Sequence, residues 1–181
     1  MSSLNIAIAG AGIGGLTAAI ALHRVGHNVT VFEQSKAFLR VGADINLTPN
    51  AVHALDGLGV GPAVRIPAAR PTHRISRMWD SGVETSRLEM SDAAEQKYGA
   101  PQLTIHRADL LAALANVFPQ EQVQFAKRAE RVLQTADGIE LHFKDGSRHL
   151  TDLLIGADGI HSVVRNALFG DEQPRFTGVV A

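Results

Sequence analysis

The sequence predicts an α/β fold built on an open parallel β-sheet. The first 33 residues have the pattern of a strand, a helix and a second strand, with a glycine cluster between the first strand and the helix. A run of short strands and a final strand–helix pair follow in the last third of the chain. Because strand–helix–strand crossovers are right-handed and join parallel strands, these segments predict a layered sheet.

The first unit begins with an apolar, partly β-branched run at Leu4–Ala9, which predicts a strand. An apolar helical stretch, Leu16–Val25, ends at Gly26, and Asn28–Phe32 forms a second β-rich run that leads into Glu33. The apolar start has no basic flank and carries patterned glycines, so we expect neither a signal peptide nor a membrane span.

In the middle of the chain, the sequence pattern changes from helical to strand-like around Arg70. Pro49–Leu58 predicts a helix, with proline in its first turn and Gly59 beyond its end. Thr72–Trp79 and Gly82–Leu88 predict two strands joined by a turn at residues 80–82, and hence an antiparallel insertion out of the main sheet. We expect a second domain to begin in this insertion, at about residues 72–100.

After the insertion the chain returns to strand-like and helical patterns. A strand at Leu103–His106 precedes a helix at Ala108–Phe118, which Pro119 ends. Turns at Asp137–Gly138 and Asp145–Gly146 predict a three-stranded meander. The expected ranges are 127–134, 139–143 and 147–150 for the meander, 153–155 for a buried strand, 160–169 for a helix, and 175–181 for the opening of a further apolar strand. That last strand suggests a chain shorter than the architecture it implies.

Composition excludes several classes of function. With 17 basic and 18 acidic residues well mixed, no basic face is expected for a nucleic acid or an anionic membrane. The absence of cysteine excludes disulfides, thiolate metal sites and cysteine nucleophiles, and suits a cytoplasmic protein. His23 and His27 have the spacing of a helical metal pair, but Gly26 ends the helix between them, so we expect no metal.

The strongest local motif is the GxGxxG of residues 10–15, which lies between the first strand and its helix. Gly10, Gly12, Gly14 and Gly15 allow a tight turn and a close approach of the backbone to a pyrophosphate. Glu33, at the end of the next strand, would accept hydrogen bonds from ribose hydroxyls. An ordinary glycine-rich turn is the alternative, and the motif alone does not distinguish NAD from FAD.

Two further stretches contain charged residues at strand-to-helix junctions. Asp158 follows the expected buried strand in GADGIHSVVR, where a carboxylate would reach a ribose, or would simply cap the helix. Arg107 lies where a guanidinium would pair with a phosphate, although a surface arginine at a helix start is the alternative.

On these motifs the sequence resembles the flavoprotein aromatic hydroxylases over essentially its whole length. GADGIHSVVR is similar to the DG motif of that family, which serves both FAD and the nicotinamide cofactor. The resemblance implies a Rossmann-like FAD-binding domain, a parallel sheet with a three-stranded β-meander, and the start of an antiparallel substrate-domain insertion. The chain would be an FAD-binding domain over residues 1–181 that is incomplete at its C-terminus.

The resemblance also implies a site and a reaction. FAD contacts carry over to Gly14, Glu33, Gln34, Arg107 and Ala129, with the loop through Ala43 near the isoalloxazine ring. NADH or NADPH would reduce FAD, and dioxygen would give a flavin C4a-hydroperoxide that hydroxylates an aromatic or N-heteroaromatic acid. Where a similar member of that family has a histidine beside the flavin and substrate, this sequence has Asn46, and it has Asp44 in place of the preceding glycine. Asn46 is at best a polar contact near the flavin, and no residue is identified as a catalytic base.

Other functions stay open from the sequence. An NAD-binding oxidoreductase domain would share the glycine motif and Glu33, but would not need the stretches around Arg107 and Asp158. A non-catalytic truncated remnant, a homodimer, or a chain that pairs with a separately encoded C-terminal half would also fit. An isolated chain of this length is expected to bind FAD weakly or not at all, and not to hydroxylate.

Overall fold

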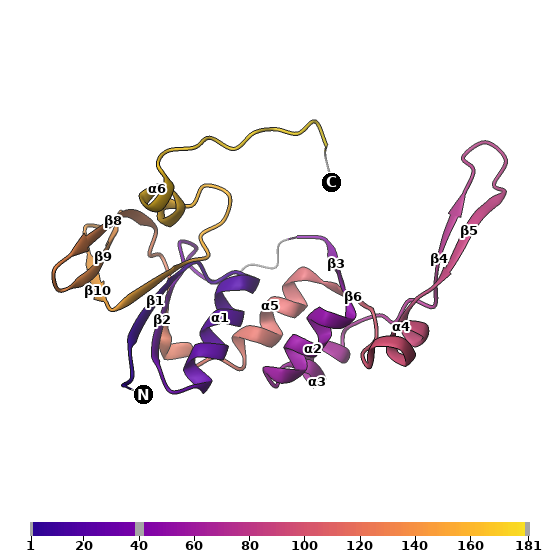
Figure 1. Ribbon diagram of the computed structural model, residues 1–181, viewed down its shortest axis with the longest axis horizontal. Coiled ribbons are helices and arrows are strands. Elements are labelled where there is room, and N and C mark those ends of the chain that lie inside the picture. The colour runs from indigo at the N-terminus through magenta and orange to yellow at the C-terminus, as the bar shows by residue number, and fades with distance from the viewer. Residues whose placement is uncertain (1, 39–41, 180–181) are drawn as a thin grey trace. The chain divides into compact units, whose positions relative to one another are not determined.

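The computed structural model describes residues 2–38 and 42–179 of the chain. These residues form two compact units (Figure 1). The first unit comprises the described residues of Met1–Phe38 and of Leu114–Ala181, and the second comprises those of Leu39–Ala113. The division falls within helix α5 (Arg107–Ala115). Within the described residues, no helix is long and apolar enough to cross a membrane.

The first unit is built on a four-stranded parallel sheet in the order β11-β1-β2-β7. Its strands are β1 (Asn5–Ala9), β2 (Asn28–Phe32), β7 (Val123–Gln124) and β11 (Leu153–Gly156). Ile8 of β1 lies opposite Val31 on one side and Ile155 on the other. The predicted open parallel sheet is therefore confirmed, with the very short β7 as an addition that the sequence did not indicate.

Burial explains why β1 is an almost uninterrupted apolar run. Four of its five residues are buried, because helix α1 (Ile13–Arg24) packs against the sheet and a second layer covers the other face. Leu16 and Ile20 of α1 are buried with Ile6 and Ile8 of β1. Parallel strands covered on both faces favour continuous apolar sequence over alternation.

The second layer is the antiparallel meander of β8 (Ala129–Thr135), β9 (Gly138–Phe143) and β10 (Arg148–Thr151). Phe32 of the parallel sheet packs on Phe143 of β9, with ring centroids 4.7 Å apart. Gly138 and Gly146 have positive φ at the two turns, which is why glycine follows aspartate there. The predicted three-stranded meander is confirmed, and Figure 1 shows it beside β1 and β2.

Three sequence expectations in this unit need correction. Strand β11 is not fully buried, because it is an edge strand and Leu153 is 41% exposed. The last helix, α6, is Val163–Phe169 and begins later than expected, after Gly159 at positive φ and the N-cap Ser162. The described part of the expected final strand, residues 175–179, is not a strand and pairs with no other segment within residues 2–38 and 42–179.

The second unit contains helices α2 (Pro49–Gly57), α3 (Gly61–Arg65) and α4 (Ser91–Tyr98) around a two-stranded antiparallel sheet. That sheet pairs β3 (Asp44–Leu47) with β6 (Leu103–His106). The helix at α2 and the strand at β6 were predicted, whereas β3, α3 and α4 were not. Strand β6 does not belong to the main sheet, since its partner within the described residues is antiparallel β3.

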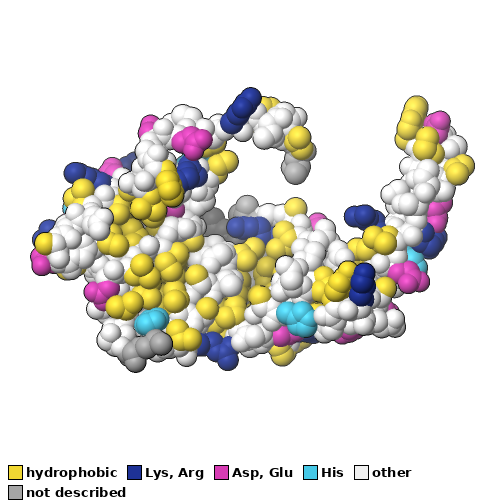
Figure 2. All heavy atoms as spheres, viewed as in Figure 1, with side chains coloured by type: hydrophobic (Ala, Val, Ile, Leu, Met, Phe, Trp, Pro, Cys, Tyr) yellow, Lys and Arg dark blue, Asp and Glu magenta, His cyan; other side chains and the backbone are white. Residues whose placement is uncertain are grey.

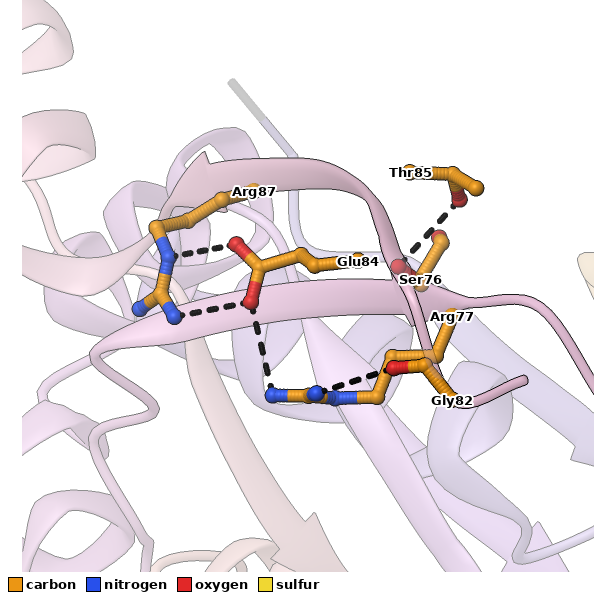
Figure 3. Close-up of polar contacts among 6 residues, drawn as sticks. All are labelled: Ser76, Arg77, Gly82, Glu84, Thr85 and Arg87. Carbon is orange, nitrogen blue, oxygen red and sulfur yellow. Dashed lines mark hydrogen bonds and ion pairs between the residues drawn. The ribbon is translucent and has the colours of Figure 1, made fainter.

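The predicted hairpin is present as β4 (His73–Arg77) and β5 (Glu84–Glu89). All its strand residues are exposed, and Figure 1 shows it projecting from the α4 region of its own unit. Glu84 accepts hydrogen bonds from both Arg77 and Arg87 on one face (Figure 3). The antiparallel pairing is confirmed.

Candidate cofactor site

The glycine-rich loop between β1 and α1 contains two glycines that the fold itself requires. Gly10 has φ +101°, and its N–H donates to the carbonyl oxygen of Phe32 at 2.8 Å. A Cβ on Gly10 would collide with the backbone of Ala157 after β11, and a Cβ on Gly15 would collide with the carbonyl oxygen of Gly10. These two glycines therefore allow β1, β11 and α1 to approach one another closely.

The other two glycines of the motif serve no such packing. A Cβ on Gly12 or Gly14 would meet no atom within 4 Å, so their bare backbone borders open space. Helix α1 begins here with Gly12 as its N-cap, without a side-chain cap and without an acidic residue in its first turn. The first N–H groups of a helix have no partner inside it, so this end can receive an anion such as a pyrophosphate.

Glu33 follows β2 and is connected to the glycine loop. Its Oε2 accepts a hydrogen bond from the Ala11 N–H at 2.9 Å, and its Oε1 accepts one from the Ser35 N–H at 2.8 Å. The carboxylate is half-buried. Since an ionised carboxylate has about four acceptor positions, the two that remain fit a pair of ribose hydroxyls.

The loop before β8 lies beside the segment that follows β2. The N–H of Lys127 donates to the carbonyl oxygen of Glu33, and the N–H of Ala126 donates to that of Ser35. Lys127 Nζ also pairs with Asp145 at 2.7 Å. Lys127, together with hydrogen bonds from Ser147, holds the pKa of the Asp145 carboxyl well below its usual range.

The predicted contacts Gln34 and Ala129 flank this loop. Gln34 is exposed. Ala129 is half-buried, lies opposite Phe143 in the meander and packs against Phe32 and its apolar neighbours. The structure thus brings Glu33, Gln34 and Ala129 to one side of the first unit, where the strand after the loop begins.

Asp158 caps helix α6. Its Oδ2 accepts hydrogen bonds from the N–H groups of Val163 and Val164 at 2.7 and 3.3 Å, and its Oδ1 accepts one from the Ser162 hydroxyl at 2.5 Å. The helix-capping alternative for Asp158 is therefore realised. The backbone of Asp158 still lies against Gly10, whose added Cβ would come within 3.1 Å of the Asp158 Cα.

These residues converge because of the sheet topology. Gly10 follows β1, Glu33 follows β2, and Asp158 follows β11 by two residues, so all three lie at the carboxyl edge of adjacent parallel strands. Ligands of open parallel sheets bind at this edge. The first unit therefore brings Gly10, Glu33 and Asp158 to the same edge of the sheet. It also contains the other predicted residues Gly12, Gly14, Gly15, Gln34 and Ala129.

The remaining predicted residues belong to the second unit. The N–H of Arg107 donates to the carbonyl oxygen of Ala43 at 3.0 Å, so these two lie together. Gly42 has φ +118°, and a Cβ there would lie 2.9 Å from the Arg107 side chain. Asn46 is exposed, and its Oδ1 accepts a hydrogen bond from the Thr104 hydroxyl at 2.8 Å.

The sequence analysis missed three supporting residues, Lys127, Ser162 and Thr104. Ser162 could have been found, because serine is a preferred N-cap residue and this one directly precedes the helical run that begins at Val163. In the structure its Oγ accepts a hydrogen bond from the Arg165 N–H at 2.9 Å. Lys127 and Thr104 acquire their partners only through pairing of distant segments. In the described part of the chain, no three histidine, aspartate or glutamate side chains cluster as metal ligands would.

The chain matches the model of the FAD binding domain family over residues 3–179. It belongs to that family. Among curated relatives, it is 41% identical to 6-hydroxynicotinate 3-monooxygenase of Bordetella bronchiseptica over 177 residues, which are 98% of this chain and 46% of that protein. It is 40% identical to 3-amino-4-hydroxybenzoate 2-monooxygenase of Streptomyces cremeus, covering 97% of this chain and 44% of the relative.

A solved structure agrees with this assignment. HpxO of Klebsiella pneumoniae, complexed with FAD and uric acid, matches with a TM-score of 0.84 and 32% identity over 91% of this chain and 41% of that one. The FAD-binding domain therefore has the Rossmann-like α/β fold that the sequence predicted. This chain spans less than half the length of the relatives it matches.

Proposed function

We propose that this chain is the FAD-binding part of an NADH- or NADPH-dependent flavoprotein monooxygenase that hydroxylates an aromatic or N-heteroaromatic acid. The observation that carries the proposal is the carboxyl edge of the parallel sheet. There, the bare backbone of Gly12 and Gly14 follows Ala11, whose N–H donates to Glu33, within a domain of the FAD-binding family. The relatives' names supply the reaction class, since they are monooxygenases of hydroxylated or aminated ring acids.

The residues of the first unit fit the ADP half of FAD. In the proposal, the backbone of Gly12 and Gly14 and the start of α1 hold the pyrophosphate, as helix N-termini hold anions. Glu33 accepts from the ribose hydroxyls, while Gln34 and Ala129 lie beside the adenine. The carboxylate of Asp158 caps α6, and the backbone of Asp158 lies against Gly10.

The residues of the second unit are proposed to face the flavin and the substrate. Arg107 would pair with a phosphate, and Ala43 and Asn46 would border the isoalloxazine ring. Thr104 occupies the Oδ1 of Asn46 and so leaves its amide N–H groups to be offered as donors. The hairpin and α4, at about residues 72–100, would form the start of the substrate domain. When bound, FAD supplies the activation of dioxygen, which these side chains cannot provide.

The whole reaction is proposed to need residues beyond the matched region, since the relatives are more than twice as long as the part they share with this chain. In isolation, the 181 residues would bind FAD weakly and would not hydroxylate. A cytoplasmic location is part of the proposal, because the reaction consumes NADH or NADPH. The assembly would be a homodimer, or a pairing with a separately encoded C-terminal half.

The test is a titration of the purified chain with FAD, followed by visible absorption and flavin fluorescence, with NADH as a competitor. Saturable binding of FAD that millimolar NADH does not displace supports the proposal. Preferential binding of NADH would instead favour a nicotinamide-dependent oxidoreductase domain. Hydroxylation by the 181 residues alone would overturn the statement that further residues are needed.

A further inference from the structure

We propose that Glu33 fixes the main chain of the glycine-rich loop, in addition to any contact it makes with ribose. It would thereby act as a positioning residue for the pyrophosphate, which it does not itself touch. This inference rests on the proposed function, and the evidence for it lies within the first unit.

The two oxygens of the carboxylate are shared between two backbone segments. Oε2 accepts from the Ala11 N–H inside the glycine loop, and Oε1 accepts from the Ser35 N–H after β2. The bond to Ala11 spans 22 residues of sequence and joins the loop to the end of the neighbouring strand. Hydrogen bonds to an ionised acceptor are about twice as strong as neutral ones, so this link holds the loop firmly.

Glu33 is itself fixed at its main chain. Its N–H donates to the Gln124 carbonyl oxygen and its own carbonyl oxygen accepts from the Lys127 N–H, both at 2.8 Å. Ser35 is held in turn, since its carbonyl oxygen accepts from the Ala126 N–H at 2.9 Å. Ala126 has φ +57°, an unfavourable conformation for alanine that this pairing maintains. The carboxylate therefore projects from a rigid support.

The position of Ala11 makes this bond important for the loop. Ala11 is only 2% exposed, so its N–H would have no water to replace the carboxylate. It directly precedes Gly12, the N-cap of α1 and the first of the two bare glycines. Because Gly10 is tied to Phe32 and Ala11 to Glu33, the direction of the backbone at Gly12 is set from β2. Glycines alone would leave this loop free to adopt other conformations.

Glutamine at position 33 would remove one of the two hydrogen bonds that the Glu33 carboxylate accepts from Ala11 and Ser35. It has nearly the shape of glutamate, but one acceptor oxygen is replaced by an NH₂ group, which would face the N–H of Ala11 or of Ser35. The direct contact with ribose and the positioning of the loop can be separated with nucleotides. ADP has both ribose hydroxyls, whereas 2′,3′-dideoxy-ADP keeps the pyrophosphate and lacks them.

The experiment compares the unsubstituted chain with Glu33→Gln and with the control Glu172→Gln, an exposed glutamate outside any helix or strand. Amide spectra of the ligand-free proteins and affinities for the two nucleotides are measured. We expect the Ala11 and Ser35 amide signals to move in Glu33→Gln and not in the control. We also expect affinity for 2′,3′-dideoxy-ADP to fall by roughly tenfold or more, as for a lost charged hydrogen bond.

The outcomes separate this inference from the proposed function. Unmoved amides, together with a loss of affinity for ADP and none for 2′,3′-dideoxy-ADP, would show that Glu33 acts on ribose alone and would overturn the inference. If the unsubstituted chain bound neither nucleotide, the proposed function would fail, while the ligand-free amide signals would still decide the inference. If Glu33→Gln did not fold, a through-hydrogen-bond coupling from the Ala11 nitrogen to the Glu33 carboxyl carbon would decide it in the unsubstituted chain. Its absence would count against the inference.

Discussion

The α-carbon of Gly15 lies against the carbonyl oxygen of Gly10, so closely that a side chain at position 15 would collide with that oxygen. Gly14, one residue earlier, faces open space. Two adjacent glycines of one motif therefore have different tasks. Gly15 allows α1 to pack against the loop, and Gly14 leaves room for what the loop is proposed to bind.

This difference predicts that alanine will act differently at the two positions. Gly15→Ala should lower the free energy of unfolding by about 1–3 kcal/mol or more, since the collision is with backbone that cannot turn aside. Gly14→Ala should leave the free energy of unfolding of the ligand-free chain unchanged or slightly higher, because alanine favours a helix, yet weaken FAD binding. Urea denaturation and FAD titration of both variants check this. Equal destabilisation by the two substitutions would contradict it.

Asp158 is predicted to contribute to stability through α6. Asp158→Ala removes the acceptor for the Val163 and Val164 N–H groups and should cost about 1 kcal/mol, as for other caps. Ser162→Ala should cost a similar amount, because its hydroxyl caps the Arg165 N–H. Thermal unfolding of the ligand-free variants measures both. If Asp158→Ala weakened only FAD binding, the capping role would be wrong.

His149 is predicted to make stability depend on pH. Its ring lies 4.9 Å from that of Phe32, and burial lowers the pKa of His149 below its usual value. The unfolded chain then binds the proton more readily, so this contribution to stability is present above about pH 6.5 and is lost as the pH falls towards the folded pKa. His149→Phe should reduce the fall in the free energy of unfolding as the pH is lowered. His161→Gln, which changes an exposed histidine, is the control and should not reduce it. Urea denaturation across this range checks the prediction, and an unchanged slope in His149→Phe would refute it.

Trp79 is predicted to report on the hairpin. It is the only tryptophan of the chain and is 93% exposed near the tip between β4 and β5. Its fluorescence in the isolated chain should be that of a water-exposed indole and should be readily quenched by iodide. A two-stranded hairpin that is exposed on both faces is only marginally stable by itself. Polypeptide that packs on this hairpin should therefore shift the fluorescence emission of Trp79 to shorter wavelength. A shielded Trp79 at micromolar concentrations of the chain alone would show that copies of it already associate there.

Apolar runs and turn residues correctly predicted those helices and strands that form from residues close together in the sequence. The first two strands, α1 and the meander follow from apolar runs separated by glycine turns, and Glu33 follows from its position after β2. Strand β3 was missed because Asp44–Leu47 is only four residues long and two of its four residues are polar. Its pairing with β6 joins segments some sixty residues apart, which no local pattern encodes.

The errors have the same physical origin. Residues 175–179 have strand-like composition, but a strand needs a hydrogen-bonded neighbour, and within residues 2–38 and 42–179 they have none. For Asp158 the sequence left a ribose contact and a helix cap open, and the structure shows the cap, because the loop after β11 turns back at Gly159 and brings its oxygens to α6. The hydrogen bond from the Ala11 N–H to Glu33 could not be read from the sequence, since it depends on the direction in which that N–H points.

The central claim is that the carboxyl edge of the parallel sheet binds FAD. The most direct test maps the amide signals of the isotopically labelled chain during a titration with FAD. The account predicts saturable shifts at Gly12, Gly14, Gly15 and Glu33 that are absent in Gly14→Ala, even if binding is weak. A folded chain whose amides at these residues do not respond to millimolar FAD would contradict it.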